Sequence, residues 1–372
     1  MYNMVNRDRM EKSSQTRVFE RKFKRKKLFM MYRFTNDYSE GCHPKLLEAI
    51  AAANTEGNFG YSTDPHCAHA VELIRAAIGR PEAAVHFLVG GTQVNTIAVC
   101  AFLRPHQAII ATEQGHPCGH ESGAIEGIGH KVIPVPCGPD AKITPEAIAT
   151  CCDAHPNEHN VQPKLVYLSN TSEMGAIYTG EELRAIHKVC QERGLYLYLD
   201  GARLASALAA GSATLSEIAD CCDAFTIGAT KNGALFGEAL VITNLPLAED
   251  LRYIIKQRGG LLAKGFLLGI QFETLFTDDL YQEMGRWSTG LALQLRDGMQ
   301  ALGIPFMSDS PSNQQFPILP NSALEVLRPD FHWEELGPVD ADHTCIRLVT
   351  SWATQQQAVN AWLAALPKAL GK

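Results

Sequence analysis

One lysine of this chain stands where a cation is hard to accommodate. Lys231 lies in residues 223–242, D-A-F-T-I-G-A-T-K-N-G-A-L-F-G-E-A-L-V-I, between two apolar runs typical of buried strands. Burying a lone ammonium group is costly, so such a lysine is paired, uncharged or covalently modified. An uncharged lysine is a nucleophile for aldehydes. Its small neighbours Gly228, Ala229 and Gly233 leave room for a ligand.

Two other features could bind further parts of the same ligand. Asp200 follows five residues that are all Leu or Tyr, so its carboxylate needs a cationic or N–H partner, and Arg203 is the local alternative. The turn Gly90-Gly91-Thr92-Gln93 follows a strand-like run and opens a helical one. Its free N–H groups and the Thr92 hydroxyl suit a phosphate, although such a turn also serves as a plain tight connection.

Pyridoxal phosphate is a ligand that would give each of these residues a role. Lys231 would bind its aldehyde as a Schiff base, and Asp200 would keep its pyridine nitrogen protonated. The turn at Gly91 would hold the phosphate, and His116, after the next strand-like run, would lie on the ring. The alternative is a binding protein without catalysis, in which Lys231 pairs only with Glu238 or Asp223.

The spacing of apolar runs predicts an α/β fold. Short apolar runs alternate with longer helical patterns from about residue 80 to 245, which predicts a mainly parallel sheet covered on both faces. Ligands bind such sheets at the carboxyl ends of the strands. Helix-start signals occur at Thr144-Pro145 and Thr179-Gly180, and Gly194 would end the second helix. The predicted strands occupy 85–89, 108–111, 132–135, 165–168, 195–199 and 225–227.

Charge and pattern divide the chain into three regions. Residues 1–29 hold ten Lys and Arg against three acidic residues, a net +7 within a total of −7, so the remainder carries −14. We interpret residues 1–30 as a basic disordered extension, with a polyanion-binding or transit segment, or a start at Met30 or Met31, as alternatives. Residues 31–250 would form a large α/β domain. Residues 251–372, with a long helical run and strand-like pieces at 315–319 and 345–349, would form a smaller α+β domain.

Composition narrows the class of protein. With 372 residues and 46% hydrophobic residues, the chain is typical of a globular protein. The acidic body argues against nucleic acid as a partner. No apolar run is long enough for a membrane span and no signal peptide is evident, so we expect a cytoplasmic location and no membrane partner. The eleven cysteines lack zinc-site spacing, and we expect reduced thiols and no metal.

Seven segments resemble, in order, the threonine aldolase and phenylserine aldolase family of the β-eliminating lyase superfamily, which are fold-type-I pyridoxal-phosphate enzymes. The resemblance covers about residues 32–352 and implies a seven-stranded sheet in the large domain. Its specific part is the D-G-A-R element followed by the lysine motif. The T-K-N-G-A-L form of that motif is nearer to phenylserine aldolases than to the S-K-G-L of common threonine aldolases. The segments are N-D-Y-S-E-G-C-H-P (36–44), F-G-Y-S-T-D-P (59–65), G-G-T-Q-V-N (90–95), G-H-P-C-G-H-E (115–121), Y-L-D-G-A-R-L (198–204), T-K-N-G-A-L-F-G-E-A-L (230–240) and I-R-L-V-T (346–350).

The resemblance implies roles for individual residues. Those implied to be catalytic are Lys231, His116 and Asp200. Those implied to bind the cofactor are Lys231, Asp200, Arg203, His116, Gly90, Gly91, Thr92, Gln93 and Thr230. Those implied to bind the substrate are Arg347, Arg203, Asn36, Asp37, Tyr38, Tyr61 and His120. Tyr61 and Lys264 would reach the site of a second subunit, and we expect a homodimer or homotetramer.

The implied reaction is retro-aldol cleavage of L-β-hydroxy-α-amino acids such as threonine, allo-threonine or phenylserine, which yields glycine and an aldehyde. The base would be His116, His120 or a water, and the arginines would hold the Cα–Cβ bond perpendicular to the cofactor ring. A β-eliminating lyase or aminotransferase on the same scaffold is the alternative. A Rossmann dehydrogenase is disfavoured because no G-x-G-x-x-G follows a strand.

Overall fold

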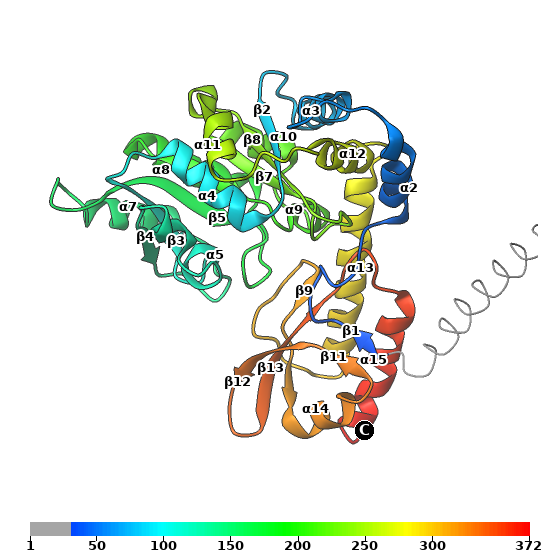
Figure 1. Cartoon of the computed structure of the whole chain (residues 1–372). Helices are drawn as coiled ribbons and strands as arrows, with labels where there is room; N and C mark the ends of the chain where they lie inside the picture. The colour runs from blue at the N-terminus through cyan, green and yellow to red at the C-terminus, as the bar shows by residue number, and fades with distance from the viewer. Residues whose placement is uncertain (1–30) are drawn as a thin grey trace, which may run out of the picture.

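The computed structural model describes residues 31–372, in which a large sheet-containing part and a smaller part are joined by a long helix (Figure 1). The basic extension predicted for residues 1–30 lies outside the described residues. Within residues 31–372, no helix is both long and apolar enough to cross a bilayer.

A seven-stranded sheet forms the centre of the large part. Its strand order is β2-β8-β7-β6-β5-β3-β4, and β8 is the one strand antiparallel to its neighbours. All six strands predicted from apolar runs are present with small shifts at their ends, so the α/β class and the mainly parallel seven-stranded sheet are confirmed. The strands are β2 (Ala84–Leu88), β3 (Gln107–Thr112), β4 (Val132–Val135), β5 (Gln162–Ser169), β6 (Tyr196–Asp200), β7 (Ala224–Gly228) and β8 (Glu238–Ile242).

Helices cover both faces of this sheet because successive strand side chains point to opposite faces. Ile109 packs in the cluster beneath α4, whereas its neighbour Ile110 packs in the opposite cluster, with α3 and α8. The helices of the large part are α2 (Pro44–Ala52), α3 (Pro65–Ile78), α4 (Gly91–Phe102), α5 (His116–Gly119), α6 (Ala124–Gly127), α7 (Pro145–Asp153), α8 (Gly180–Arg193), α9 (Leu204–Ala209), α10 (Leu215–Cys221), α11 (Leu251–Gln257) and α12 (Phe266–Leu275), with 3-10 turns Ala53–Thr55 and Leu245–Ala248.

The predicted helix signals are confirmed where side chains cap the backbone. Thr144 Oγ1 accepts a hydrogen bond from Ala147 N at 3.2 Å at the start of α7. Thr179 and Glu182 form a capping box at the start of α8, and Gly194 ends that helix with a φ of 64°.

The small part surrounds the lower half of α13 (Figure 1). Phe34, beside the first described strand, packs in its core with Trp362. The run predicted as one strand at 315–319 is divided at Pro317, which has no N–H to donate. The elements are β1 (Tyr32–Arg33), which pairs in parallel with β11 (Phe331–His332), then α13 (Leu280–Ala301), β9 (Gln314–Gln315), β10 (Ile318–Pro320), α14 (Asn321–Leu327), β12 (Glu334–Pro338), β13 (His343–Val349) and α15 (Gln356–Ala369).

Helices α11 and α12 pack against the large sheet. Leu251 and Ile255 of α11 share a core cluster with α4, and Phe272 of α12 stacks on Phe87 of β2 with ring centroids 4.9 Å apart. The predicted domain boundary after residue 250 stays a prediction. We propose that the two parts meet within α13.

Candidate active site

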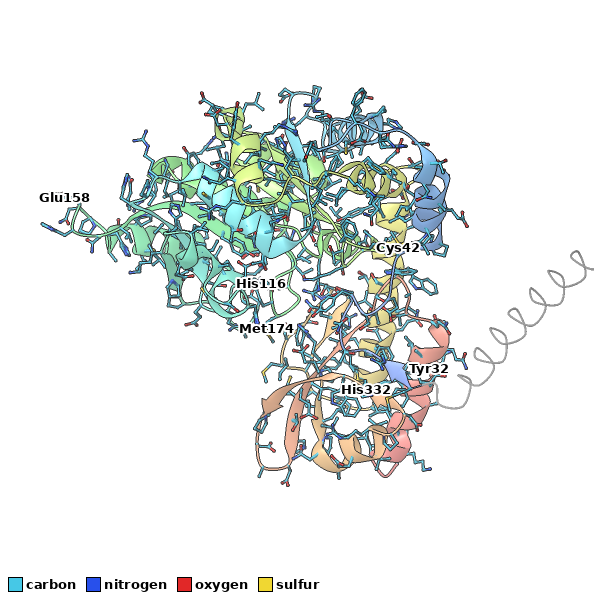
Figure 2. All side chains as sticks on the ribbon, in the orientation of Figure 1. Tyr32, Cys42, His116, Glu158, Met174 and His332 are labelled. Carbon is cyan, nitrogen blue, oxygen red and sulfur yellow. The ribbon has the colours of Figure 1, made fainter. Side chains whose placement is uncertain are left out.

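A cavity of about 770 Å³ lies at the carboxyl ends of β2, β3, β5, β6 and β7, closed on one side by residues of the small part. Figure 2 shows His116 and Met174, two of its lining residues, on the side of the large part that faces the small part. The predicted site residues that line the cavity are Tyr38, Gly90, Gly91, Thr92, His116, His120, Asp200, Arg203, Thr230, Lys231 and Arg347. Asn36, Asp37, Tyr61 and Gln93 are not among its lining residues.

Lys231 follows β7, and its amine makes no hydrogen bond or ion pair with any residue of 31–372. Burial and the Arg203 guanidinium lower its pKa, although nearby carboxylates oppose this change. Asp223, the alternative partner considered above, accepts hydrogen bonds from Leu197 N at 2.8 Å and Asn244 Nδ2 at 2.7 Å. Lys231 is therefore available as a nucleophile.

Glu238 begins β8 and is only 4% exposed, yet it lines the same cavity. Burial raises the pKa of Glu238 to about 8; Asp200 adds to this change and Lys231 opposes it. Thr230, between the two strands, exchanges hydrogen bonds with the backbone of Gly237. The cavity thus holds a carboxyl group that can take up a proton near neutral pH.

Asp200 ends β6 with its carboxylate fixed by three donors. Oδ2 accepts from the Tyr167 hydroxyl at 2.6 Å and from Asn95 Nδ2 at 3.1 Å, and Oδ1 accepts from Ala202 N at 2.9 Å. Arg203, the local alternative partner of Asp200, pairs elsewhere. Asp200 is therefore held as a buried hydrogen-bond acceptor facing the cavity.

Arg203 forms a two-pronged ion pair with Asp37 of the N-terminal segment. Its Nε and Nη2 donate to Asp37 Oδ2 and Oδ1 at 2.7 and 3.1 Å, and Asn313 Nδ2 donates to Oδ2 at 3.0 Å. Burial alone would raise the pKa of Asp37, but Arg203 and Lys231 hold it below its usual value. Arg203 Nη1 has no partner within residues 31–372, so it remains for a ligand in the cavity.

The Gly90-Gly91 turn is open toward the cavity. Gly90 caps α4 without a side-chain hydrogen bond, and a Cβ added to Gly90 or Gly91 would meet no atom within 4 Å. The first N–H groups of the helix are thus free for an anion. Gln93 is used differently, because its Oε1 accepts from Val89 N at 3.4 Å.

Two histidines lie side by side after β3. His116 Nδ1 is 3.0 Å from Glu121 Oε1, and its backbone N–H donates to Glu173 Oε1 at 2.8 Å. The ring centroid of His120 is 5.5 Å from that of His116. Burial, His116 and Arg347 lower the pKa of His120. Either ring can therefore accept a proton in the cavity.

The small part contributes Arg347 from β13. Its Nη2 pairs with Glu334 of β12, its Nη1 donates to Gln314 Oε1 at 3.3 Å, and its Nε is buried with no partner in the described part of the chain. Tyr38 also lines the cavity, and Asn36 Oδ1 accepts a hydrogen bond from Tyr38 N at 3.0 Å. The guanidinium thus has unused bonding capacity for a carboxylate.

Tyr61 lies away from this cavity. Its ring is 4.3 Å from Lys256 Nζ, and its N–H donates to Ala263 O at 3.3 Å, next to Lys264. The two residues predicted to reach a second subunit therefore occupy one surface.

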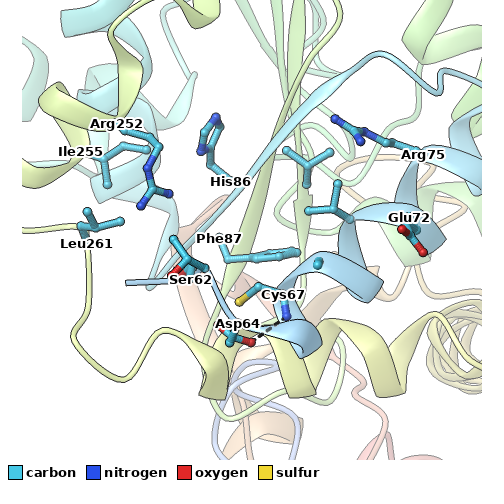
Figure 3. Close-up of a pocket in the computed structure, with 14 residues that line it drawn as sticks. Ser62, Asp64, Cys67, Glu72, Arg75, His86, Phe87, Arg252, Ile255 and Leu261 are labelled. Carbon is cyan, nitrogen blue, oxygen red and sulfur yellow. Dashed lines mark hydrogen bonds between the residues drawn. The ribbon is translucent and has the colours of Figure 1, made fainter. Parts of the chain in front are cut away.

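A second cavity, of about 310 Å³, lies beside this surface between α3, β2 and α11 (Figure 3). His86 and Arg252 line it together with Asp64, which caps α3 by accepting from Cys67 N at 2.9 Å. Burial and Arg252 lower the pKa of His86 to about 4. Cationic and acidic groups are mixed here, and the cavity is not at the ends of the parallel strands.

The main cavity fits pyridoxal phosphate. Lys231 offers an amine to its aldehyde, Asp200 offers a fixed acceptor to its ring nitrogen, and the turn at Gly90-Gly91 offers N–H groups to its phosphate. The empty volume around both glycines is what a close-lying anion requires. Within residues 31–372, no group of three or more His, Cys, Asp or Glu side chains is arranged to hold a metal ion.

Several residues of the site were not predicted from the sequence. Asn95 and Glu121 lie within motifs that were recognised, but no role followed from their position, and Glu238 was considered only as an ion-pair partner of Lys231. A buried polar residue inside a motif is a signal that could have found them. The unpredicted residues are Asn95, Glu121, Tyr167, Glu173, Asn313, Gln314 and Glu334.

Comparisons with known proteins show the family of this chain. The family model described as Beta-eliminating lyase matches residues 35–358. The low specificity L-threonine aldolase of Pseudomonas aeruginosa is 31% identical over 301 residues, which covers 79% of this chain and 86% of that protein. The structure of Leishmania major threonine aldolase superposes with a TM-score of 0.89 at 48% identity and covers 91% of this chain and 99% of that chain.

A more distant structure shows the fold alone. An aspartate aminotransferase of Thermus thermophilus matches with a TM-score of 0.65 at 18% identity and covers 93% of each chain. Fold, cofactor fit and family match lead to the same assignment. The chain belongs to the beta-eliminating lyase family of pyridoxal-phosphate-dependent enzymes and has the fold-type-I architecture.

Proposed function

We propose that this enzyme cleaves L-β-hydroxy-α-amino acids of the threonine type to glycine and an aldehyde, as a carbon–carbon lyase. The main support is that three features line one cavity: the unpaired amine of Lys231, the hydrogen-bonded carboxylate of Asp200 and the open turn at Gly91. The relatives from Pseudomonas aeruginosa and Leishmania major, both named threonine aldolases, support the substrate class.

The cofactor would be held by residues at the strand ends. When bound, pyridoxal phosphate withdraws the electron pair left on Cα as the Cα–Cβ bond breaks. Lys231, whose pKa is lowered, would hold the cofactor by its aldehyde through the side-chain amine. Asp200 is already fixed by its three donors, so it keeps the proton on the ring nitrogen with little reorganisation.

The substrate carboxylate would bind Arg347, with Arg203 Nη1 as a second donor. A planar guanidinium suits a carboxylate, and the unpartnered Nε of Arg347 adds to its capacity. Glu334 already binds the same guanidinium and would compete with the substrate carboxylate. Tyr38 lines the cavity and would contact the substrate side chain.

The β-hydroxyl proton would pass to His116, to His120 or to a water that they position. The O–H electron pair then forms the second bond of the aldehyde, and a proton later returns to Cα to give glycine. Both rings lie in the cavity with centroids 5.5 Å apart. The base is therefore one of two adjacent groups or their shared water.

A homodimer or homotetramer would complete the site. Tyr61 and the loop at Ala263 lie together on the surface, where Tyr61 is 43% exposed. Tyr253 of α11 is 77% exposed, so aromatic surface is available nearby for a subunit contact. The cytoplasmic location remains a prediction from the sequence.

A substrate panel tests the proposal. Purified holoenzyme is given threonine, allo-threonine, phenylserine and serine, and glycine and aldehyde are measured. Lys231→Ala should lose both aldehyde formation and the cofactor's bound absorbance, whereas Lys188→Ala, in which an exposed lysine is removed, should keep both. Formation of pyruvate and ammonia, or amino transfer to a keto acid, would contradict the aldolase assignment and identify the alternative.

A further inference from the structure

Glu121 is a buried carboxylate that the reaction described above does not use. It is 5% exposed, and its Oε1 is shared by Asn95 Nδ2 at 2.8 Å and His116 Nδ1 at 3.0 Å. Its Oε2 is buried with no partner in residues 31–372. Burying a carboxylate with one unpartnered oxygen costs stability, so we expect Glu121 to have a role other than filling space.

The hydrogen bonds of Asn95 show that Glu121 acts as a hydrogen-bond acceptor. The amide donates to Glu121 and also to Asp200 Oδ2 at 3.1 Å, and its Oδ1 accepts from the Tyr198 hydroxyl at 2.9 Å. One NH₂ group between two carboxylates satisfies both when each is an acceptor. The amide is thus saturated, and Glu121 Oε1 keeps acceptor capacity for one more donor.

That donor is the ring of His116. A carboxylate that accepts at Nδ1 requires the proton on Nδ1, which leaves Nε2 as a lone pair. Nε2 of His116 makes no hydrogen bond to residues 31–372, and His116 lines the cavity. His120 differs, because neither of its ring nitrogens has a hydrogen-bond partner in the described chain to select a tautomer.

We infer that Glu121 is a positioning residue, which holds His116 in the Nδ1–H tautomer and presents its Nε2 as the acceptor of the β-hydroxyl proton. This inference rests on the proposed function and selects His116 among the bases left open there. As the Cα–Cβ bond breaks, the proton moves from the hydroxyl to Nε2, the O–H pair enters the C=O bond and the Cα–Cβ pair stays with Cα. Glu121 then faces an imidazolium, which its carboxylate stabilises.

The substitution Glu121→Gln distinguishes a role in positioning His116 from a role in the fold alone. The side-chain oxygen of glutamine can still accept from Asn95, so the local hydrogen bonding of the fold is largely kept. That oxygen, in the place of Oε1, can also still accept from His116 Nδ1, but the neutral amide lacks the negative charge that stabilises the imidazolium formed when His116 takes the β-hydroxyl proton. A structural Glu121 would tolerate this change, whereas a positioning Glu121 would not.

The test uses the holoenzyme with ¹⁵N-labelled histidine. Long-range ¹H–¹⁵N correlation, with the His116 signals assigned by His116→Gln, should show the proton on Nδ1 in the wild type. Glu121→Gln should keep the proton on Nδ1 but lower kcat for threonine by about 10²-fold, because the charge that stabilises the imidazolium is lost. KM should change little, Glu121→Asp should restore part of kcat, and Glu126→Gln, in which an exposed carboxylate of α6 is removed, should match the wild type.

A wild-type His116 with its proton on Nε2 would overturn the inference even if Glu121→Gln failed to fold. So would a folded Glu121→Gln protein with wild-type kcat. Failure of the proposed function looks different: the wild type would release no aldehyde from any hydroxy amino acid, while the tautomer could still be read.

Discussion

The ion pair between Asp37 and Arg203 should be a main support of the active site, and Asp37→Ala removes it. Asp37 is 1% exposed and accepts three hydrogen bonds, two from Arg203 and one from Asn313. The substitution leaves the guanidinium of Arg203, whose side chain is only 15% exposed, without its anion. An uncompensated buried charge is among the costliest single changes in a protein.

The expected loss follows from these contacts. Removing one partner of a buried pair costs about 3–5 kcal/mol of unfolding free energy. Arg203 lines the cavity, so water can reach part of its fork, and we expect about 3 kcal/mol, at the lower end of that range. Asp37→Asn keeps one acceptor oxygen but turns an NH₂ group toward a donor, so we expect about 2 kcal/mol.

Urea denaturation followed by fluorescence, at fixed protein and pyridoxal phosphate concentrations, measures these losses. The matched control is Asp153→Ala, in which an ion pair with Arg193 is broken at a helical site where the two side chains are 65% and 38% exposed, and it should cost at most about 1 kcal/mol. The kcat/KM for threonine should fall in Asp37→Ala and not in the control. Equal stability losses in Asp37→Ala and Asp153→Ala would refute the reasoning.

Three further changes test other parts of the cavity. Gly91→Ala adds a Cβ in open space at the start of α4, so the cofactor-free protein should unfold at an unchanged or slightly higher temperature, while the Kd for pyridoxal phosphate rises about tenfold or more. An unchanged Kd would argue against phosphate binding there. Glu334→Gln removes a competitor of the substrate carboxylate, so KM for threonine should fall about 3- to 10-fold with kcat nearly constant, and a rise in KM would contradict the assigned role of Arg347. Burial raises the pKa of Glu238 to about 8, so its stabilising contribution is full below its unfolded pKa and is lost as the pH rises toward 8. Relative to Glu238→Gln, the unfolding free energy of the cofactor-free wild type should fall by on the order of a few kcal/mol between pH 5 and 9. Unfolding free energies of the two proteins that run parallel with pH would contradict this.

The positions of the strands, and the reactive residues that follow them, could be predicted because both depend on local sequence pattern. Apolar runs located the strands of the large sheet, and the residues just after them, including Lys231, Asp200 and His116, do meet in one cavity. Helix starts could be predicted in the same way, because a capping residue such as Thr179 accepts a hydrogen bond from the backbone only three residues further on. Features of this kind need no knowledge of distant parts of the chain.

The partners of the site residues could not be predicted in the same way. Arg203 was placed beside Asp200 by proximity in sequence, yet its partner Asp37 is 166 residues away. Arg347 is paired with Glu334 across two antiparallel strands, whose register depends on the small part as a whole. A long-range pair of this kind leaves no periodic signal in a single sequence.

The N-terminal segment has a consequence for how the enzyme can be made. Its strand Tyr32–Arg33 pairs with Phe331–His332, and its Asp37 binds Asn313, so both contacts wait for the last part of the chain. During translation the cofactor-binding sheet can form early, but Asp37 lacks one of its three hydrogen-bond donors until residue 313 has emerged. The nascent chain therefore completes its substrate-binding residues last. A chain truncated within the small part would keep its cofactor-binding residues but would lack part of the substrate site.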